Sequence, residues 1–302
     1  MGEHMSFLSP VGVIGIGLMG EVFARRLISA GFSVVGFDID PAKTARLTEF
    51  GARPAASIAD VARAANPIVL AVFDTDQVEE VVEKEILPVL GPHGREPGKI
   101  VMCTSTCDPD RVAALAGRVA KQGLRFLETP VSGTSEQVRQ GDGVGLIGGD
   151  QEIAAEVDDV LQAMFPKRFF VGAAGDGGRT KLAVNLILGL NRLALAEGLV
   201  FATRLGLEPH AFLEVAQASA AYSQVMDTKG TKMIARDFAP EGRARQTLKD
   251  AHLMLEQARA AGQDLPLLRV HAEVLAACVQ AGEGDCDNSV VIEEIRRRGE
   301  AS

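Results

Sequence analysis

Residues 11–20 read VGVIGIGLMG, in which an apolar, strand-like run passes directly into a G-x-G-x-x-G turn. A helix-like stretch over residues 21–30 follows the turn. Gly15 permits a tight turn, Gly17 lets the backbone approach a pyrophosphate, and Gly20 lets the helix pack closely on the strand. The helix then directs free N–H groups and the positive end of its dipole at the phosphates. The segment therefore predicts a strand–turn–helix unit that binds a dinucleotide.

A second strand-like run over residues 33–37 ends at Asp38. An acidic side chain at this position can accept a hydrogen bond from the ribose 2′-hydroxyl of NAD, and it repels the 2′-phosphate of NADP. The pattern predicts NAD as the cofactor and makes NADP the less favoured choice. The alternative is a glycine-rich turn followed by a solvated aspartate.

The first half of the chain alternates strand-like and helix-like segments. Strands are predicted at residues 11–14, 33–37, 67–73, 100–103, 125–127, 144–148 and 168–171, and helices at residues 21–30, 42–50, 77–86, 109–122 and 151–164. Repeated βα units of this spacing form parallel sheets with helices on both faces. We therefore predict an α/β fold with a Rossmann-type, doubly wound parallel sheet.

The pattern changes after residue 171. Residues 172–178 are dense in glycine and predict a flexible hinge, and residues 179–205 read as one long apolar helix. Helical periodicity continues beyond it without a strand pattern. We predict an NAD-binding Rossmann-like domain over residues 1–174, and a linking helix with an all-α domain over residues 175–302. Because a long apolar helix commonly packs in a core or at a subunit interface, it favours a homodimer or homotetramer.

The composition bounds the partners. The 302 residues carry a net charge of −9, no Trp and one Tyr, which argues against nucleic acid or an anionic membrane as the main partner. We find no signal peptide and no apolar run of about 18 residues that could span a bilayer. The four cysteines lack zinc-ligand spacing, so no metal site is expected. They are typical of reduced thiols in a cytoplasmic protein, with a redox or catalytic role left open for Cys103 or Cys107.

Two segments place hydroxyl groups after predicted strands. Ligands of open parallel sheets bind beyond the carboxyl ends of the strands, so a hydroxyl of residues 103–106 can reach a cofactor, although serine and threonine also cap helices. Residues 130–134 read PVSGT. The Ser132 hydroxyl, with the N–H groups of Gly133 and Thr134, can hold a carboxylate. The alternative is a helix cap and a turn.

Lys181 and Asn185 stand four residues apart and therefore share one face of the predicted long helix. Their helical neighbours are apolar, so the two residues mark a polar spot on a buried element. Burial favours the neutral amine of a lysine, which suits proton transfer near neutral pH, and Asn185 can orient a hydroxyl or a carboxylate. The alternative for Lys181 is a solvated side chain. Lys249 and Asp250 are adjacent, do not share a helix face, and are typical of a surface pair when taken alone.

Taken together, these segments resemble the β-hydroxyacid dehydrogenase family over nearly the whole chain. Four motifs follow in the family's order: VIGIGLMG at residues 13–20, TPVSG at residues 129–133, GDGGRTK at residues 175–181 continuing to Asn185, and LKD at residues 248–250. Four motifs in this order are more specific than the glycine turn alone.

The resemblance implies a role for each motif. It makes Lys181 the catalytic acid/base, together with Asn185. It places Ser132 and Gly133, with Asn185, at the substrate. It places these residues at the cofactor: Gly15, Gly17, Leu18, Met19, Gly20, Thr106 and Lys249. The resemblance also implies a helical second domain and a multimer.

The chain departs from the family's pattern at several positions. Cys103 stands where the family has an aspartate, Thr134 stands where it has a second glycine, and residues 134–144 differ in the loop that follows. We expect an NAD-dependent oxidoreductase that interconverts a small, carboxylate-bearing 3-hydroxy acid and the matching aldehyde or keto acid. The alternatives are an imine reductase and a non-catalytic, nucleotide-binding regulatory protein. The altered loop leaves the identity of the hydroxy acid open.

Overall fold

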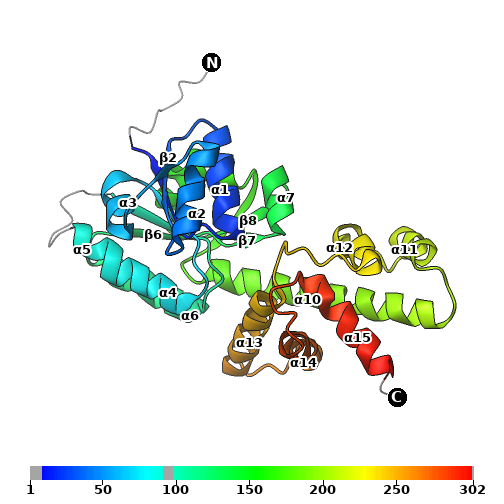
Figure 1. Cartoon of the computed structure of the whole chain (residues 1–302). Coiled ribbons are helices and arrows are strands. Elements are labelled where there is room, and N and C mark those ends of the chain that lie inside the picture. The colour runs from blue at the N-terminus through cyan, green and yellow to red at the C-terminus, as the bar shows by residue number, and fades with distance from the viewer. Residues whose placement is uncertain (1–8, 91–97, 301–302) are drawn as a thin grey trace. The chain divides into compact units, whose positions relative to one another are not determined.

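The computed structural model describes residues 9–90 and 98–300. The chain divides into two compact units, Met1–Lys181 and Leu182–Ser302. The division lies inside one continuous helix, α10 (Asp176–Arg204), which is drawn in green in Figure 1. This helix therefore contributes its first turns to the first unit and its remaining turns to the second.

The first unit alternates strands with helices, as its hydrophobic pattern predicts. Its strands are β1 (Val11–Ile14), β2 (Val34–Phe37), β3 (Arg53–Pro54), β4 (Ile68–Leu70), β5 (Ile100–Cys103), β6 (Arg125–Glu128), β7 (Val131–Ser132), β8 (Val144–Gly149) and β9 (Lys167–Gly172). Its complete helices are α1 (Leu18–Ser29), α2 (Pro41–Arg46), η1 (Leu47–Phe50), α3 (Ile58–Ala64), α4 (Thr75–Glu80), η2 (Val81–Ile86), α5 (Leu87–Leu90), α6 (Pro109–Ala120), α7 (Ser135–Gln140), α8 (Gln151–Glu156) and α9 (Asp158–Met164).

Within the described residues, the strands form one nine-stranded sheet in the order β3-β2-β1-β4-β5-β6-β8-β7, with β9 paired to β8. β1 is parallel to β2 and β4, and β5 is parallel to β4 and β6. The carboxyl ends of β1, β2 and β5 therefore lie at one edge of the sheet, where ligands of such folds bind. The mostly parallel sheet with helices on both faces confirms the predicted Rossmann-type α/β fold (Figure 1).

The central strands β1, β4 and β5 are buried on both faces, and alternate residues enter different cores. Val11 and Val13 of β1 pack in one cluster with Phe23 and Leu27 of α1. Ile14 of β1 packs in the other cluster, which contains buried side chains of α3, η2 and α6. Burial on both faces explains why these strands read as continuous apolar runs rather than as an alternation of apolar and polar residues.

Several helices begin at an acidic cap followed by proline. The side chain of Asp40 accepts a hydrogen bond from the backbone N–H of Ala42, and Pro41 is the first residue of α2. Asp108 caps α6 in the same way, ahead of Pro109. An aspartate satisfies free N–H groups of the first turn, and proline fits the first helical position because its missing N–H has no partner there.

The sheet differs from the prediction at one edge. β8 runs antiparallel to β6 and β7, so the expectation of a wholly parallel sheet is wrong there. Hydrophobic patterning identifies a strand but does not encode its direction. Between β6 and β8 the chain forms the short strand β7 and the helix α7, and it then returns along the sheet in the opposite direction.

Other boundaries also differ. The predicted helix over residues 151–164 is two helices, because the backbone leaves helical geometry at Val157. The predicted hinge over residues 172–178 is shorter than expected, since Gly177 and Gly178 already belong to the first turn of α10. In both cases the side-chain pattern does not mark the residue at which the backbone enters or leaves helical geometry.

In the described residues of the second unit, the regular elements are all helices. After α10 this unit contains α11 (Pro209–Ala218), α12 (Gln224–Ala235), α13 (Ala244–Ala260), α14 (Pro266–Gln280), η3 (Asn288–Val290) and α15 (Val291–Glu300). One apolar cluster forms its core, with Leu195 and Leu199 from α10, Val274 and Leu275 from α14, and Val291 from α15. The helical periodicity of this half of the chain predicted such an arrangement.

The apolar character of α10 corrects one expectation. By length and composition alone, this helix is long and apolar enough to cross a membrane, although the sequence was expected to contain no such stretch. A single helix of this kind is weak evidence for a membrane span, because helices in protein cores can be equally long and apolar. Among its side chains, Ile187 is 61% exposed and Phe201 is 66% exposed.

Candidate active site

The glycine turn joins β1 to α1, and its glycines have different steric roles. Gly15 has φ +89°, and a Cβ there would lie 2.5 Å from the carbonyl oxygen of Ala71. A Cβ at Gly20 would lie 1.9 Å from the carbonyl oxygen of Gly15. At Gly17, by contrast, no described atom lies within 4 Å of an added Cβ. The open space at Gly17, beside the N-terminus of α1, fits a pyrophosphate that needs close approach to the backbone.

Leu18 and Met19 form the first turn of α1, which begins earlier than the sequence pattern predicts. Leu18 is 40% exposed, so it stands at the surface beside the turn. Both residues lie where the fingerprint places them, at the helix end that a dinucleotide's phosphates approach.

Asp38 links the second strand to the glycine turn. One carboxylate oxygen accepts the backbone N–H of Ile16 at 2.7 Å, and the other accepts the backbone N–H of Asp40 at 2.9 Å. The ammonium group of Lys43 lies 3.6 Å from the second oxygen. The side chain is therefore held in place and is not the freely solvated aspartate of the alternative interpretation.

A pocket opens beyond the carboxyl end of β2, with a volume of about 430 Å³. It is lined by Phe37, Asp38, Ile39, Pro41, Thr44, Ala45, Pro54, Ala55 and Ala56. Its walls are mainly apolar, with one carboxylate at the strand end. This combination fits an adenosine, whose base needs apolar walls and whose ribose needs an acceptor.

The hydroxyl segment after β5 does not cap a helix. The hydroxyl of Thr104 donates to the carbonyl of Leu70, and the hydroxyl of Ser105 donates to the carbonyl of Val72. Asp108 caps α6 instead, so the interpretation of this segment as a helix cap is wrong. Thr106 is half-buried at the end of this segment, near the edge of the sheet where the cofactor is expected.

The cysteines nearby are unsuited to nucleophilic chemistry. Cys103 and Cys107 are both free and buried. A hydrogen bond with Cys107, together with burial, raises the pKa of the Cys103 thiol well above its usual value. A protonated, buried thiol is neither a nucleophile nor a ready target of oxidation.

The segment after β6 contains the predicted carboxylate site. Ser132 is half-buried, and its hydroxyl makes no hydrogen bond to any of residues 9–90 or 98–299. Gly133 has φ +138°, a value that favours glycine. Thr134 caps α7: its hydroxyl accepts the N–H of Gln137, and its own N–H donates to the Gln137 side chain at 2.9 Å. The cap in this segment is therefore Thr134, and its N–H is already engaged.

Lys181 lies beside this segment, early in α10. Its side chain is buried, with 7% of the residue exposed. Its ammonium nitrogen donates to the carbonyl oxygen of Val131 at 2.5 Å. The alternative of a solvated lysine is therefore wrong. Because Val131 directly precedes Ser132, the structure brings a buried amine and a partly exposed hydroxyl together within the first unit.

Asn185 and Lys249 belong to the second unit, where both contact Asp250. The Asn185 amide nitrogen lies 3.4 Å from one carboxylate oxygen of Asp250, and the Lys249 ammonium lies 3.2 Å from the other. Asp250 is only 7% exposed. The expectation of an ordinary surface pair is wrong, because Asp250 is a buried carboxylate that connects α10 with α13.

Sequence reasoning missed Glu128, the last residue of β6. It is 1% exposed, and its carboxylate accepts the backbone N–H groups of Gly175 at 2.9 Å and Gly178 at 2.8 Å. Burial raises the pKa of Glu128 to about 7, even though hydrogen bonds from Gly175, Gly178 and Gly177 favour the charged form. The available signal was an acidic residue that ends a buried strand just before the TPVSG motif.

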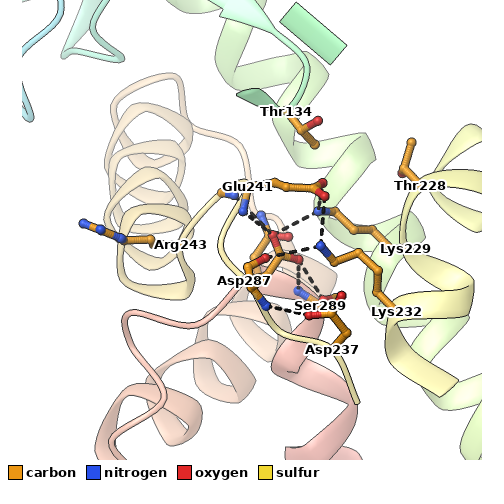
Figure 2. A network of polar contacts seen from close by, with 12 residues as sticks. Thr134, Thr228, Lys229, Lys232, Asp237, Glu241, Arg243, Asp287 and Ser289 are labelled. Carbon is orange, nitrogen blue, oxygen red and sulfur yellow. Dashed lines mark hydrogen bonds and ion pairs between the residues drawn. The ribbon is translucent and has the colours of Figure 1, made fainter. Parts of the chain in front are cut away.

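A second missed feature is an ionic network in the helical unit (Figure 2). Asp287 is fully buried and accepts hydrogen bonds from Lys229 at 3.0 Å and from the backbone N–H and hydroxyl of Ser289. Lys229 and Lys232 both contact Glu241, at 2.9 and 2.8 Å. The network joins α12, the segment before α13 and η3. No group of three or more His, Cys, Asp or Glu residues in the described part of the chain could hold a metal ion.

Two protein families match this sequence, and the descriptions of both name NAD binding. The family described as "NAD binding domain of 6-phosphogluconate dehydrogenase" matches residues 10–172, and that described as "NAD-binding of NADP-dependent 3-hydroxyisobutyrate dehydrogenase" matches residues 175–295. The chain is 31% identical to L-threonate dehydrogenase of Cupriavidus necator, over 93% of this chain and 94% of that protein. It belongs to the β-hydroxyacid dehydrogenase family.

Other relatives of this β-hydroxyacid dehydrogenase support the assignment. The chain is 29% identical to 2-hydroxy-3-oxopropionate reductase of Escherichia coli, over 94% of this chain and 96% of the relative. A crystal structure of 3-hydroxyisobutyrate dehydrogenase from Salmonella typhimurium superimposes with a TM-score of 0.85 at 27% identity, covering 94% of this chain and 99% of that one. The protein is an NAD(P)-dependent oxidoreductase that acts on the CH–OH group of hydroxy acids.

Proposed function

We propose that this β-hydroxyacid dehydrogenase interconverts a small 3-hydroxy acid and the matching aldehyde or keto acid, with NAD as cofactor and Lys181 as general acid/base. The observation that carries the proposal is the position of the Lys181 amine. It is buried and lies 2.5 Å from the carbonyl oxygen of Val131, directly beside Ser132. A titratable group thus stands next to a hydroxyl that can hold the substrate.

The cofactor, when bound, supplies the hydride acceptor at its nicotinamide. In its neutral form, the Lys181 amine accepts the proton of the substrate hydroxyl as the carbinol carbon becomes a carbonyl, and the resulting ammonium returns a proton in the opposite direction. The contact with Val131 holds the amine in one place, because a hydrogen bond fixes both its distance and its direction. A lysine suits this role since its amine can release a proton near neutral pH when partly desolvated, whereas a guanidinium does not.

Ser132 and Gly133 bind the substrate carboxylate in this proposal. The Ser132 hydroxyl is not engaged by the described residues, and the backbone at Gly133 turns sharply at φ +138°. A hydroxyl donor beside a backbone N–H group is suited to an anion, and the N–H of Thr134 is not part of this site because it is engaged by the Gln137 side chain. Thr134 supports this segment by capping α7, and Asn185, one turn after Lys181 on α10, orients the substrate.

Asp38 favours NAD over NADP. Its carboxylate is fixed by two backbone N–H groups, from Ile16 and Asp40, at the end of β2. A fixed negative charge there accepts the ribose 2′-hydroxyl and repels a 2′-phosphate. Lys43, at 3.6 Å, offsets part of this repulsion. The expected NAD preference is therefore a ratio of kcat/KM values above one rather than an exclusion of NADP.

We also propose that the protein is a homodimer or homotetramer and that it is cytoplasmic. The exposed apolar side chains of α10, Ile187 and Phe201, are of the kind that a subunit interface covers. The free cysteines agree with a reducing compartment. Light scattering coupled to size-exclusion chromatography measures the subunit number directly.

A spectrophotometric screen tests the proposed function. The purified protein is assayed with NAD⁺ and separately with NADP⁺ over small hydroxy acids, starting with L-threonate. We expect turnover of at least one 3-hydroxy acid with higher kcat/KM for NAD⁺, and loss of turnover in Lys181→Ala. A preference for NADP⁺ would refute the role of Asp38, and turnover of a cyclic imine but of no hydroxy acid would refute the substrate class.

A further inference from the structure

Glu128 stands outside the proposed chemistry, yet it is among the most buried charged residues of the first unit, with 1% of its surface exposed. Its two carboxylate oxygens are both engaged: one accepts the N–H of Gly175 and the other accepts the N–H of Gly178. These N–H groups belong to the turn before α10 and to its first helical turn, where backbone donors have no partner within the helix. A strand residue therefore caps a helix that begins about fifty positions later in the chain.

The packing around Glu128 leaves room for glycine only. A Cβ at Gly177 would lie 2.9 Å from one carboxylate oxygen, and a Cβ at Gly178 would lie 2.7 Å from the other. A Cβ at Gly148 of β8 would lie 2.9 Å from the backbone nitrogen of Gly177 and 3.1 Å from Glu128. The glycine-dense segment thus lets the helix backbone pack against the carboxylate, rather than acting as a flexible hinge.

The same two segments meet again at the proposed catalytic residue. Glu128 begins the run that continues to Val131 and Ser132, and Gly178 stands three residues before Lys181, about one helical turn away. Glu128 holds the helix backbone, and Val131 receives the Lys181 ammonium at 2.5 Å. Two sets of contacts between the segment 128–132 and the start of α10 therefore set the distance between Lys181 and Ser132. One is made by Glu128 and the other by Val131.

We propose that Glu128 is a positioning residue, which fastens the first turn of α10 to β6 and thereby sets the place of Lys181 relative to Ser132. The inference rests on the proposed role of Lys181. Glu128 does not contact substrate or exchange a proton with it. Its contribution is geometric: misplacement of a catalytic group by about 1 Å can lower a rate by about a hundredfold.

The test compares Glu128→Gln with a matched surface variant, Glu156→Gln. Glu156 is a half-exposed carboxylate of the same unit that pairs with Arg125, at the opposite end of β6, at 2.6 Å. An amide has one acceptor oxygen, so Glu128→Gln turns an NH₂ group toward one of the two helix N–H donors. We expect kcat to fall by roughly ten- to a hundredfold in Glu128→Gln, with KM and the Kd for NAD⁺ unchanged. Glu156→Gln changes none of these quantities.

Amide hydrogen exchange, read by mass spectrometry on peptides covering residues 173–184, gives a measurement that does not depend on turnover. We expect faster exchange at the start of α10 in Glu128→Gln, without faster exchange in β1 or α6. If the wild type oxidises no hydroxy acid, the proposed function fails while the exchange measurement still tests the anchor. Unchanged exchange in Glu128→Gln overturns the proposal, and so does faster exchange with wild-type kcat.

Gly148→Ala provides a second route if Glu128→Gln does not fold. It keeps the carboxylate but inserts a methyl group 2.9 Å from the Gly177 nitrogen, which displaces the helix end. We expect the same local increase in exchange and a lower kcat with the Kd for NAD⁺ unchanged. Wild-type values of both quantities in Gly148→Ala contradict the proposal.

Discussion

Glu128 in the first unit and Asp287 in the second are both almost completely buried, yet their surroundings shift their pKa values in opposite directions. Glu128 faces backbone N–H groups, and burial raises its pKa to about 7. For Asp287 burial also acts to raise the pKa, but Lys229 and Ser289 outweigh it and the pKa is lowered. A buried carboxylate with an adjacent cation stays charged at low cost, whereas one held by amides alone is close to neutralisation.

The two units therefore connect their segments through buried carboxylates of different kinds. The helical unit fastens its segments with compensated charge, because Lys229 and Asp287 neutralise one another. The sheet unit fastens α10 with an acidic group that has no adjacent cation among the described residues: Arg179 acts on Glu128 only at longer range and pairs directly with Asp110 and Asp176. A buried acidic group whose pKa is raised toward neutrality is more typical of the surroundings of a functional site than of a purely structural core, which agrees with the proposed role of Lys181.

The largest expected effect is on catalysis by the first unit, at Lys181. Lys181→Ala should lower kcat by about 10²–10⁴-fold, the contribution of a general acid/base, while the Kd for the cofactor stays unchanged. Steady-state kinetics with thermal melting of the same samples measures both activity and folding. Lys181→Arg should fail as well, because a guanidinium retains its proton near neutral pH. Near-normal kcat in a folded Lys181→Arg variant would mean that another group moves the proton.

The structural side is tested by removing the cation. Lys229→Met leaves Asp287 buried without its main partner, so the free energy of unfolding of the helical unit should fall by about 3–5 kcal/mol. Urea denaturation followed by circular dichroism measures it. Arg269→Met removes an exposed partner of Asp264 in the same unit and should cost less than about 1 kcal/mol. Equal losses in the two variants would show that the buried network has no special importance.

The pH dependence of stability distinguishes the two carboxylates. The pKa of Glu128 rises from 4.5 to about 7 on folding, so the folded state binds its proton more tightly than the unfolded state does. Its contribution to stability is therefore greatest below pH 4.5 and declines by about 3 kcal/mol as the pH rises through 7. The difference in free energy of unfolding between wild type and Glu128→Gln, measured across this range, should show this slope. Asp287 contributes with the opposite sign, and its stabilisation is lost only as the pH falls below its ordinary pKa.

The smallest expected effect is at the substrate carboxylate. Ser132→Ala removes one hydrogen bond to a charged group, so KM for the hydroxy acid should rise roughly tenfold while the Kd for NAD⁺ is unchanged. Initial-rate kinetics and calorimetric titration of the cofactor measure the two quantities. Ser57→Ala, which removes a helix cap in the same unit, serves as control. Weaker NAD⁺ binding with an unaltered KM would place Ser132 at the cofactor instead.

The sequence predicted those parts of the fold that rest on local pattern. Strand and helix alternation, the glycine turn and the helical second half all follow from periodicity and from backbone requirements at Gly15 and Gly20. The buried lysine was also predictable, because apolar neighbours surround Lys181 along the helix. These features depend on residues that lie close together in the chain.

Features that depend on distant residues escaped prediction. The hydrogen bonds of Glu128 to Gly175 and Gly178 join residues 47 and 50 positions apart, and the pairing of Lys229 with Asp287 joins residues 58 positions apart. The reversed direction of β8 depends on how the chain returns past β7, which side-chain patterning does not encode. The polar partners of a buried charge are selected by the folded topology, so a single sequence shows the charge but not its partner.

The open space at Gly17 has a consequence for how such a protein can evolve. Folding itself demands glycine at positions 15 and 20, where a methyl group would collide with carbonyl oxygens, but nothing described lies within 4 Å of a methyl group at position 17. The packing of the described residues therefore places no steric demand for glycine at position 17, whereas the proposed close approach of a dinucleotide does. Under the proposed binding mode, a single substitution there leaves the scaffold intact and weakens the binding of the coenzyme, so one mutation separates a dehydrogenase from a protein of the same shape without its chemistry.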